Sequence, residues 1–434
     1  MASSEVTALM VEPVARVDGH IGVPGDKSIS HRALLVGAIC EGETRVLHFG
    51  RGADTESTLA VVRSLGVRVD EEDVDTLVVH GAGLHGLAAP GAPLDCGNAG
   101  TLVRLVSGVL AFQQGSFELV GDESLSRRPM ARIAEPLTQM GARVESVDGH
   151  LPLHIEGGEL HGITYELPVA SAQVKSAILL AGLGAEGKTT VVEPVPTRDH
   201  TELMLEAAGA RLRRKGNAVT IEPAKRLSLP EVDVPGDISS AAPFITVAAL
   251  LAGSKLTVHD LHLNPRRTGL LDVLERMGID VGVLNKRRVA GELRGDVEIT
   301  SKPLVATRID ADEVPRLVDE LPLVALLAAF AHGTTVISGA GELRAKESDR
   351  IEAVATGLRS LGVHIEARPD GFVVRGTPSR PRGGRMDAQG DHRIAMLGAV
   401  AGAVSREGVQ VEGADSVAIS FPGFFDLLDS VAQR

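Results

Sequence analysis

A basic turn at Pro24–Arg32 has the residue types that bind phosphate or carboxylate groups. Pro and Gly open it and an apolar run follows, so the pattern predicts a helix that Ser28 or Ser30 caps. A helix N-terminus offers unpaired backbone N–H groups to an anion. Ser28 and Arg32 are spaced i and i+4 and can address one ligand, with Lys27 just ahead of the first turn. We interpret this stretch as an anion site; the alternative is a capped, solvated helix start that happens to be basic.

The same arrangement returns twice in the first half of the chain. Gly97–Thr101 is a polar, glycine-bearing helix start with Arg104 one turn further on. Ser171–Lys175 begins another helix with a hydroxyl and an amide. Between them, Arg128 stands beside a second arginine before a proline, a pair that faces solvent unless a polyanion is nearby. The repetition favours phosphate binding over a chance capped turn at each place.

Carboxylates accompany the cations in the second half of the chain. Asp319–Glu320 comes directly before an apolar helix. Lys346–Arg350 begins another helix, with its lysine and arginine expected on one face and Glu347 between them. Asp391–Arg393 opens the last repeat. Carboxylates beside cations can serve as general acid and base, although caps and solvated charged turns have the same composition.

Three patterns resemble known sites but lack their context. Residues 182–189 match the phosphate-loop pattern G-x-x-x-x-G-K-[ST], but a helix is expected before them and a strand after them, the reverse of that motif. Cys96 has no base near it in the sequence, which favours a packed thiol. His150 and His154 share i, i+4 spacing, but Pro152 and the alternating apolar neighbours indicate a strand. We therefore expect no metal site and no cofactor.

A recurring phrase, in which a helix ends at a glycine and a strand follows, marks internal repeats. Its glycines, about 70–85 residues apart, are Gly66, Gly141, Gly209, Gly278 and Gly362. The corresponding repeats predict six helix starts, near Ser28, Thr101, Ser171, Ser239, Pro322 and His392. Two prolines flank an acidic stretch at Pro230–Pro235, the expected boundary between two similar α/β domains of three units each.

The composition restricts the classes of function. The chain has 434 residues, enough for two or three domains, and its net charge of −13 disfavours nucleic acids and anionic membranes as partners. Aromatic residues make up 2%, too few for the stacking platforms of single-stranded nucleic-acid binding. The two cysteines, Met1–Val11 without a signal-peptide pattern, and the lack of an apolar run of ~18 residues predict a soluble cytoplasmic protein.

Together these motifs resemble the 5-enolpyruvylshikimate-3-phosphate synthase family over nearly the whole chain. The stretches that carry the resemblance are Pro24–Arg32, Gly97–Thr101, Arg128–Pro129, Ser171–Gln173, Lys346–Arg350 and Asp391–Arg393. The resemblance implies the inverse α/β architecture of the enolpyruvyl transferases, with two similar domains of three βαβαββ units. They would comprise residues 25–231, and residues 1–24 with 232–434, with the active-site cleft between them.

The resemblance also implies an activity, 3-phosphoshikimate 1-carboxyvinyltransferase. The enolpyruvyl group of phosphoenolpyruvate passes to the 5-hydroxyl of shikimate 3-phosphate by addition and then elimination of phosphate, on the shikimate pathway to chorismate and the aromatic amino acids. The family needs no metal or cofactor, its partners are the two small-molecule substrates, and glyphosate occupies its phosphoenolpyruvate site. We expect a monomer. The alternative is the sister enzyme that acts on UDP-N-acetylglucosamine, which shares the fold but uses a mobile-loop cysteine and lacks the Lys-Ser-x-Ser-x-Arg start.

The roles of individual residues follow from the resemblance by position. The implied catalytic residues are Asp319 as base, Glu347 as the acid toward the methylene carbon, and Lys27. The implied ligands of shikimate 3-phosphate are Lys27, Ser28, Arg32, Ser171, Ala172, Gln173, Arg198, Asp319 and Lys346. Those of phosphoenolpyruvate are Lys27, Gly100, Arg128, Gln173, Arg350 and Arg393.

Three positions depart from the commonest bacterial pattern. Leu105 replaces a proline, Arg198 stands where others carry serine, and Ile419 occupies a site where many members carry a phosphate-binding lysine. The Ser-Ala-Gln-Val-Lys motif and Thr197–His200 instead resemble the class II members of the family. The missing lysine bears on affinity rather than on the reaction, because the other cations remain.

Overall fold

The computed structural model describes residues 8–434, so most of the stretch inspected for a signal peptide lies outside the described residues. The chain forms two compact units. The first unit is Pro24–Pro235 together with Arg288–Glu292; the second unit is the remainder, namely the residues up to Val23, Gly236–Arg287 and Leu293–Arg434. The sequence places the divisions after residues 24 and 231, whereas the structure places them after Val23 and Pro235 and adds the tip of a hairpin to the first unit. That the active site lies in a cleft between domains stays a prediction.

Each sheet of the first unit joins a parallel pair of strands to an antiparallel hairpin. In order across each sheet, the strands are β16 (Glu231–Asp233), β3 (Glu41–Leu47), β5 (Leu77–Ala82) and β4 (Arg68–Glu71); β6 (Leu94–Asp95), β7 (Gly115–Val120), β9 (His150–Gly157) and β8 (Arg143–Val147); and β11 (Thr164–Glu166), β13 (Thr189–Val192), β15 (Ala218–Ile221) and β14 (Leu212–Lys215). The short strands β10 (Leu160–His161) and β12 (Ala185–Glu186) form a further pair. The helices are α1 (Lys27–Ala38), α2 (Ala53–Ser64), α3 (Gly100–Leu110), α4 (Glu123–Ser126), α5 (Ala131–Gln139), α6 (Ala172–Gly182) and α7 (His200–Ala207).

The second unit repeats this pattern with two variations. Its sheets are β20 (Arg308–Ile309), β21 (Gly333–Ile337), β23 (Gly371–Gly376) and β22 (His364–Arg368); β18 (Asp280–Val289), β19 (Glu292–Thr300), β17 (Lys255–His262), β2 (Arg16–Ile21) and β26 (Ala432–Gln433); and β1 (Ala8–Val11), β25 (Val409–Glu412) and β24 (Gly384–Asp387). Its helices are α8 (Ile238–Leu250), α9 (Gly269–Arg276), α10 (Leu321–Phe330), α11 (Arg350–Ser360), α12 (His392–Val404) and α13 (Phe424–Val431), with short 3₁₀ helices η1 (Val314–Arg316), η2 (Gly341–Ala345) and η3 (Ala414–Ile419).

The strand pairing shows how the chain passes between the units. β2 directly precedes α1 in the sequence, but it pairs in parallel with β17 of the second unit. β16 directly precedes α8 and pairs instead with β3 of the first unit. The first and fourth repeats have therefore exchanged their first strands. In the last repeat, β1 supplies the antiparallel partner of β25, which explains why no glycine phrase or hairpin follows α12.

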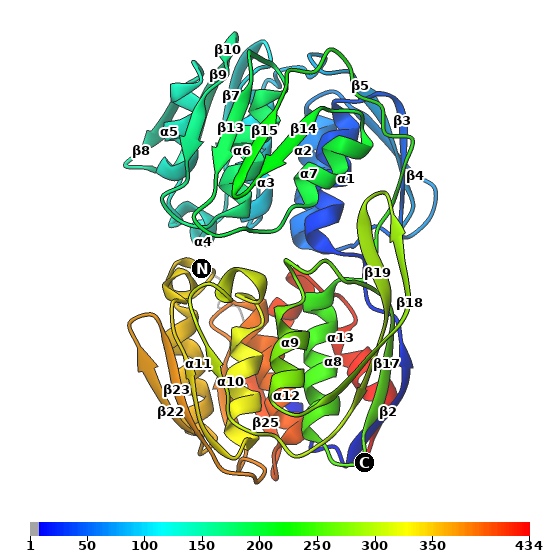
Figure 1. The fold of residues 1–434 in the computed structure, drawn as a ribbon, viewed down its shortest axis with the longest axis vertical. Coiled ribbons are helices and arrows are strands. Elements are labelled where there is room, and N and C mark those ends of the chain that lie inside the picture. Colours follow the sequence, from blue (N-terminus) through cyan, green and yellow to red (C-terminus); the bar gives the residue numbers. More distant parts are fainter. Residues whose placement is uncertain (1–7) are drawn as a thin grey trace. The chain divides into compact units, whose positions relative to one another are not determined.

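The helix that opens each repeat is apolar on most of its surface, which is typical of a helix buried on all sides. α10, with the sequence Leu-Pro-Leu-Val-Ala-Leu-Leu-Ala-Ala-Phe, shows this most clearly. It packs against α8 and α12, which run beside it in the second unit (Figure 1). α3 likewise packs against α1 and α6 in the first unit. Each unit thus has a core of three helices with its sheets outside.

The predicted fold class is confirmed, and the six predicted helix starts differ from the observed ones by no more than one residue. The five phrase glycines also behave as predicted. They follow helix ends with φ between +88° at Gly66 and +110° at Gly141, a left-handed region that other residues rarely adopt. Among the described residues, no helix is both long and apolar enough to cross a bilayer.

Candidate active site

The start of α1 is capped by Asp26, not by Ser28 or Ser30 as the sequence analysis predicts. The Asp26 carboxylate accepts a hydrogen bond of 2.9 Å from the backbone N–H of Ile29. Ser30 is buried inside the helix, and its hydroxyl accepts from the backbone N–H of Gly50 at 3.0 Å. The prediction is wrong because Asp26, two residues before Ser28, competes for the cap, and its carboxylate is at least as good an acceptor as a hydroxyl.

The two cations of α1 differ in their surroundings. Lys27 Nζ lies 2.7 Å from an oxygen of Asp54, with 21% of its side chain exposed. Arg32 is 3% exposed, and it donates to the Ser28 carbonyl at 2.8 Å and to the Thr201 hydroxyl at 2.7 Å. Burial lowers the pKa of Arg32 to about 10, so the guanidinium is still charged at neutral pH. The positive charge of Arg198 acts in the same direction, which places these two arginines within electrostatic reach of each other.

The starts of α3 and α6 are linked through Gln173. Its amide oxygen accepts from Arg104 at 2.9 Å, and its amide N–H donates to the Thr101 hydroxyl at 2.9 Å. Arg104 also donates to the Gly100 carbonyl at 3.1 Å. The structure therefore brings Gly100 and Gln173 together, and α6 begins beside them, capped by Ser171.

Arg128 lies at the same place. It is 7% exposed and donates to the side-chain oxygen of Asn98 at 2.7 Å. Its neighbour Arg127 is instead exposed and pairs with Glu123. Of the two adjacent arginines, Arg128 is thus the buried one, and its guanidinium lies beside Gly100. Asn98 and Arg104 are not among the ligands expected from the sequence, although Asn98 lies in the motif Gly97–Thr101 and Arg104 lies one turn after it.

Arg350 is the centre of the candidate site in the second unit. Its guanidinium lies 2.6 Å from Glu347, 2.8 Å from Asp391 and 3.3 Å from Asp319, and its side chain is 2% exposed. Burial alone would lower the pKa of Arg350, but the charges of Asp391, Glu347 and Asp319 together raise it. The two predicted proton-transfer groups, Asp319 and Glu347, therefore share one permanent cation.

Lys346 and Arg350 do not share a helix face, contrary to the prediction. Asp349 caps α11, which begins at Arg350, so Lys346 lies before the helix, at the end of η2. Both cations nevertheless reach the same oxygen of Asp319, with Lys346 Nζ at 3.5 Å. They converge through the loop rather than through helical spacing.

Asp391 joins two parts of this site. It caps α12 by accepting from the backbone N–H of Arg393 at 2.9 Å, and it also holds Arg350. The Arg393 guanidinium donates to the Ser239 carbonyl at 2.9 Å. The sequence analysis singled out the motif at Asp391 but assigned no role to the aspartate; a carboxylate directly before a helix was the available signal.

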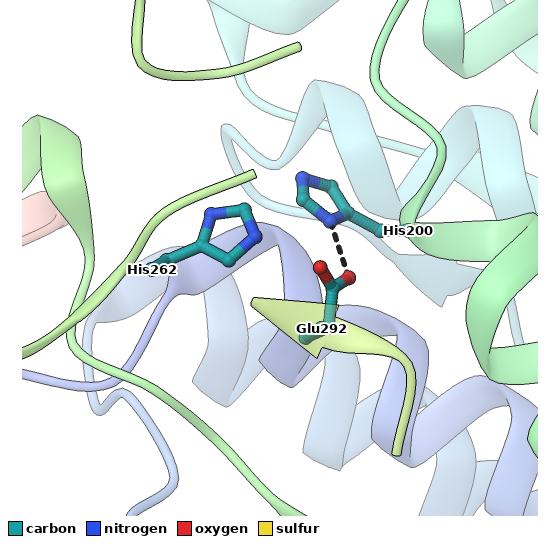
Figure 2. A group of neighbouring side chains, drawn as sticks. All are labelled: His200, His262 and Glu292. Atoms are coloured by element: carbon teal, nitrogen blue, oxygen red, sulfur yellow. Dashed lines mark hydrogen bonds and ion pairs between the residues drawn. The ribbon is translucent and has the colours of Figure 1, made fainter. Parts of the chain in front are cut away.

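The patterns set aside in the sequence analysis are also set aside by the structure. Cys96 is fully buried, and burial raises the pKa of its thiol to about 12, so it is no nucleophile at neutral pH. His150 and His154 lie on β9, as predicted. Figure 2 shows a different pair in the first unit, in which His200 lies 2.7 Å from Glu292; the third residue drawn, His262, belongs to the second unit.

We expect Lys188→Ala to leave turnover within about twofold of wild type. Residues 182–189 lie between α6 and β13, in the reverse order to a phosphate loop, and Lys188 is 58% exposed and paired with Glu222 at 2.9 Å. Steady-state kinetics with both substrates, beside Lys27→Ala, provide the measurement. Equal losses in the two variants would contradict the assignment.

His31 gives a prediction for stability. It is fully buried and hydrogen-bonded to Thr58 at 2.6 Å, and burial lowers its pKa to about 3. Between that value and the unfolded value near 6.5, the unfolded chain binds a proton that the folded chain does not, so this contribution to stability falls as the pH is lowered. We expect the loss in unfolding free energy from pH 7 to pH 5 to be about 2 kcal/mol smaller in His31→Gln, as measured by urea unfolding. An unchanged difference would show that His31 does not titrate in this way.

The chain is similar to known proteins of one family. The family model for EPSP synthase (3-phosphoshikimate 1-carboxyvinyltransferase) matches residues 11–428. A 3-phosphoshikimate 1-carboxyvinyltransferase of Alkalilimnicola ehrlichii is 51% identical over 96% of this chain and 94% of its own length, and one of Acidithiobacillus ferrooxidans is 49% identical over 96% of both.

Solved structures agree. An EPSP synthase from Acinetobacter baumannii superimposes with a TM-score of 0.87 at 42% identity, covering 98% of each chain. The enolpyruvyl transferase NikO from Streptomyces tendae has the same fold, with a TM-score of 0.78 at 19% identity and 98% coverage of each chain.

Proposed function

Since this chain belongs to the EPSP synthase family, we propose that the cations of the first unit and the Arg350 cluster of the second perform the reaction of that family. The reaction is enolpyruvyl transfer from phosphoenolpyruvate to the 5-hydroxyl of shikimate 3-phosphate, with release of phosphate, on the shikimate pathway. The relatives that match 96% of the chain at about 50% identity are named for this activity. The alternative acceptor, UDP-N-acetylglucosamine, is not favoured.

In the first unit, we assign the binding of anions to side chains at the three helix starts. Lys27, Ser28 and Arg32 would hold shikimate 3-phosphate together with Arg198, the second arginine within electrostatic reach of Arg32. The start of α6, with Ser171, Ala172 and Gln173, completes this group of ligands. Phosphoenolpyruvate would bind to Arg128, Gly100 and Gln173. These residues lie together, since Arg104 donates to both Gly100 and Gln173 and the Arg128 guanidinium lies beside Gly100.

In the second unit, we assign the proton transfers to the carboxylates around Arg350. Asp319 would remove the proton of the 5-hydroxyl as that oxygen attacks C2 of phosphoenolpyruvate, and Glu347 would give a proton to the methylene carbon. Elimination of phosphate from the tetrahedral adduct then requires the methyl carbon to lose a proton again. Lys346, Arg350 and Arg393 would balance the charges of the substrates.

Charge explains how Glu347 can carry a proton. Arg350 and Lys346 face three carboxylates, so the cluster has one negative charge in excess. A phosphoenolpyruvate carboxylate at Arg350 would add another, and crowded like charges favour protonation of one of them. We assign this role to Glu347, which pairs with Arg350 at 2.6 Å, because a substrate carboxylate bound to the same arginine would compete with it for that cation.

The observation that carries the proposal is the convergence of Asp319 and Glu347 on Arg350. The test is a coupled assay of phosphate release. We expect release that needs both phosphoenolpyruvate and shikimate 3-phosphate, and none when UDP-N-acetylglucosamine replaces the latter. Release with the nucleotide sugar alone as acceptor would overturn the assignment of the substrate.

The remaining assignments are coarser. We propose a monomer in the cytoplasm. The cytoplasm is supported by Cys40 and Cys96, which are both free, buried thiols and so fit a reducing compartment. No metal or cofactor enters the proposed steps.

A further inference from the structure

Lys175 is a buried cation that the proposed reaction does not use. It lies on α6, two residues after Gln173, and its side chain is fully buried. Its ammonium nitrogen lies 3.1 Å from Glu193 and 2.8 Å from Glu202, which are 2% and 1% exposed. The three side chains are almost fully buried, and together they carry one negative charge in excess. We call this group the Lys175 cluster.

The Lys175 cluster holds the segment that carries Arg198. Glu193 uses its second oxygen to accept from both the backbone N–H of Thr197, at 3.0 Å, and the Thr197 hydroxyl. Arg198 is the next residue. Glu202 lies in the first turn of α7, directly after Thr201, which accepts a hydrogen bond from Arg32 at 2.7 Å. Both ends of the segment are thus tied to one ammonium group.

Stability alone is a poor reason for such a cluster. Buried ion pairs can often be replaced by apolar side chains of similar size without loss, because the cost of desolvation offsets the attraction. Buried charges are better explained where they fix one arrangement among several. Here the arrangement includes Arg32, whose charge is stabilised by that of Glu202 more than by any other neighbouring group.

We propose that Lys175 is a positioning residue for the binding of shikimate 3-phosphate. Its ammonium group pairs with both Glu202 and Glu193, so that these carboxylates compete less with the substrate phosphate for Arg32 and Arg198. Without the ammonium group, two buried carboxylates would repel each other and draw the nearby guanidinium groups toward themselves. Lys175 itself touches neither substrate. This inference rests on the proposed function.

The test is the pattern of kinetic constants in Lys175→Met, which keeps the length of the side chain and removes its charge. We expect the KM for shikimate 3-phosphate to rise at least tenfold, while the KM for phosphoenolpyruvate and kcat change less than threefold. Lys175→Gln keeps N–H donors for the carboxylates and serves where the methionine variant does not fold. Lys188→Met is the matched control, since that lysine is 58% exposed. We expect this variant to keep kcat and both KM values.

A double variant separates charge from packing. In Lys175→Met with Glu202→Gln, the cation and one competing anion are both removed, so we expect the KM for shikimate 3-phosphate to return to within threefold of wild type. A double variant that binds this substrate as weakly as the single variant would overturn the proposal. Equal rises in the KM values of both substrates would do the same, because they indicate a general loss of structure. Phosphate release by the wild-type protein tests the proposed function separately: an inactive wild type refutes that function, whereas an active wild type with the wrong KM pattern refutes only the role of Lys175.

Discussion

Glu347→Gln and Asp319→Asn should each lower kcat by about 10²–10⁴-fold while leaving the KM values within about threefold of wild type. Each substitution removes a proton-transfer group but keeps its size and a polar atom near Arg350. Glu347 lies 2.6 Å and Asp319 3.3 Å from that guanidinium, and the oxygen of each amide can still accept a hydrogen bond from it. The variants should therefore fold and bind substrates. Steady-state rates of phosphate release, with both substrates varied, provide the measurement.

The matched control for these variants is Glu352→Gln. Glu352 lies on α11, the helix that begins at Arg350, but its side chain is 54% exposed and pairs with Arg344 at 3.3 Å. We expect its kcat to stay within twofold of wild type, because exposed pairs of this kind contribute little. Near-native turnover in both Glu347→Gln and Asp319→Asn would refute the assignment of acid and base. A loss in only one of them would leave that residue as the sole proton-transfer group.

The same substitutions should differ in their pH dependence. Glu347 must carry a proton when phosphoenolpyruvate is attacked, and Asp319 must be ionised. A bell-shaped dependence of kcat/KM is therefore expected for the wild type. The residual activity of Glu347→Gln should lack the alkaline limb of this profile, and that of Asp319→Asn should lack the acidic limb. Unchanged profiles in both variants would show that other groups titrate.

Much of the architecture could be predicted because each repeat contains the same local sequence signals. A polar start, an apolar run and a glycine after the helix recur with the period of the fold, and each signal acts within a few residues. The helix cap at Asp26 was missed because three polar residues within five positions, Asp26, Ser28 and Ser30, compete for it. The exchange of β2 and β16 between repeats could not be predicted from local signals, since strand pairing depends on residues far apart in sequence.

The candidate site divides in the same way. Residues at helix starts, such as Lys27 and Gly100, were found because their backbone setting is local. The Lys175 cluster was not, because Glu193 and Glu202 meet that lysine only once α6, the following loop and α7 are packed together. Lys346 was expected on a helix face with Arg350, but it reaches Asp319 from the loop before α11.

Gly100→Ala should raise the inhibition constant of glyphosate at least about tenfold and the KM of phosphoenolpyruvate by less. Gly100 is the first residue of α3, and a Cβ there would lie 2.8 Å from Arg104 Nη1 and 2.9 Å from Arg128 Nη1. Both guanidinium groups would have to shift, and Arg128 is a proposed ligand of phosphoenolpyruvate. Glyphosate, which occupies this site in the family, is longer than the substrate, so it has less room to follow the shift. Overpacking of this kind costs about 1–3 kcal/mol, and about 1.4 kcal/mol corresponds to the expected tenfold.

Inhibition measured against varied phosphoenolpyruvate decides this prediction, with Gly158→Ala as control. A Cβ at Gly158 would meet nothing within 4 Å, and we expect that variant to keep both constants. Arg128→Lys adds a second comparison, because it keeps the charge but loses the hydrogen bond to Asn98 at 2.7 Å. It should weaken substrate and inhibitor alike, since it adds no bulk at the turn. Equal shifts of both constants in Gly100→Ala would show that the turn does not discriminate by ligand length.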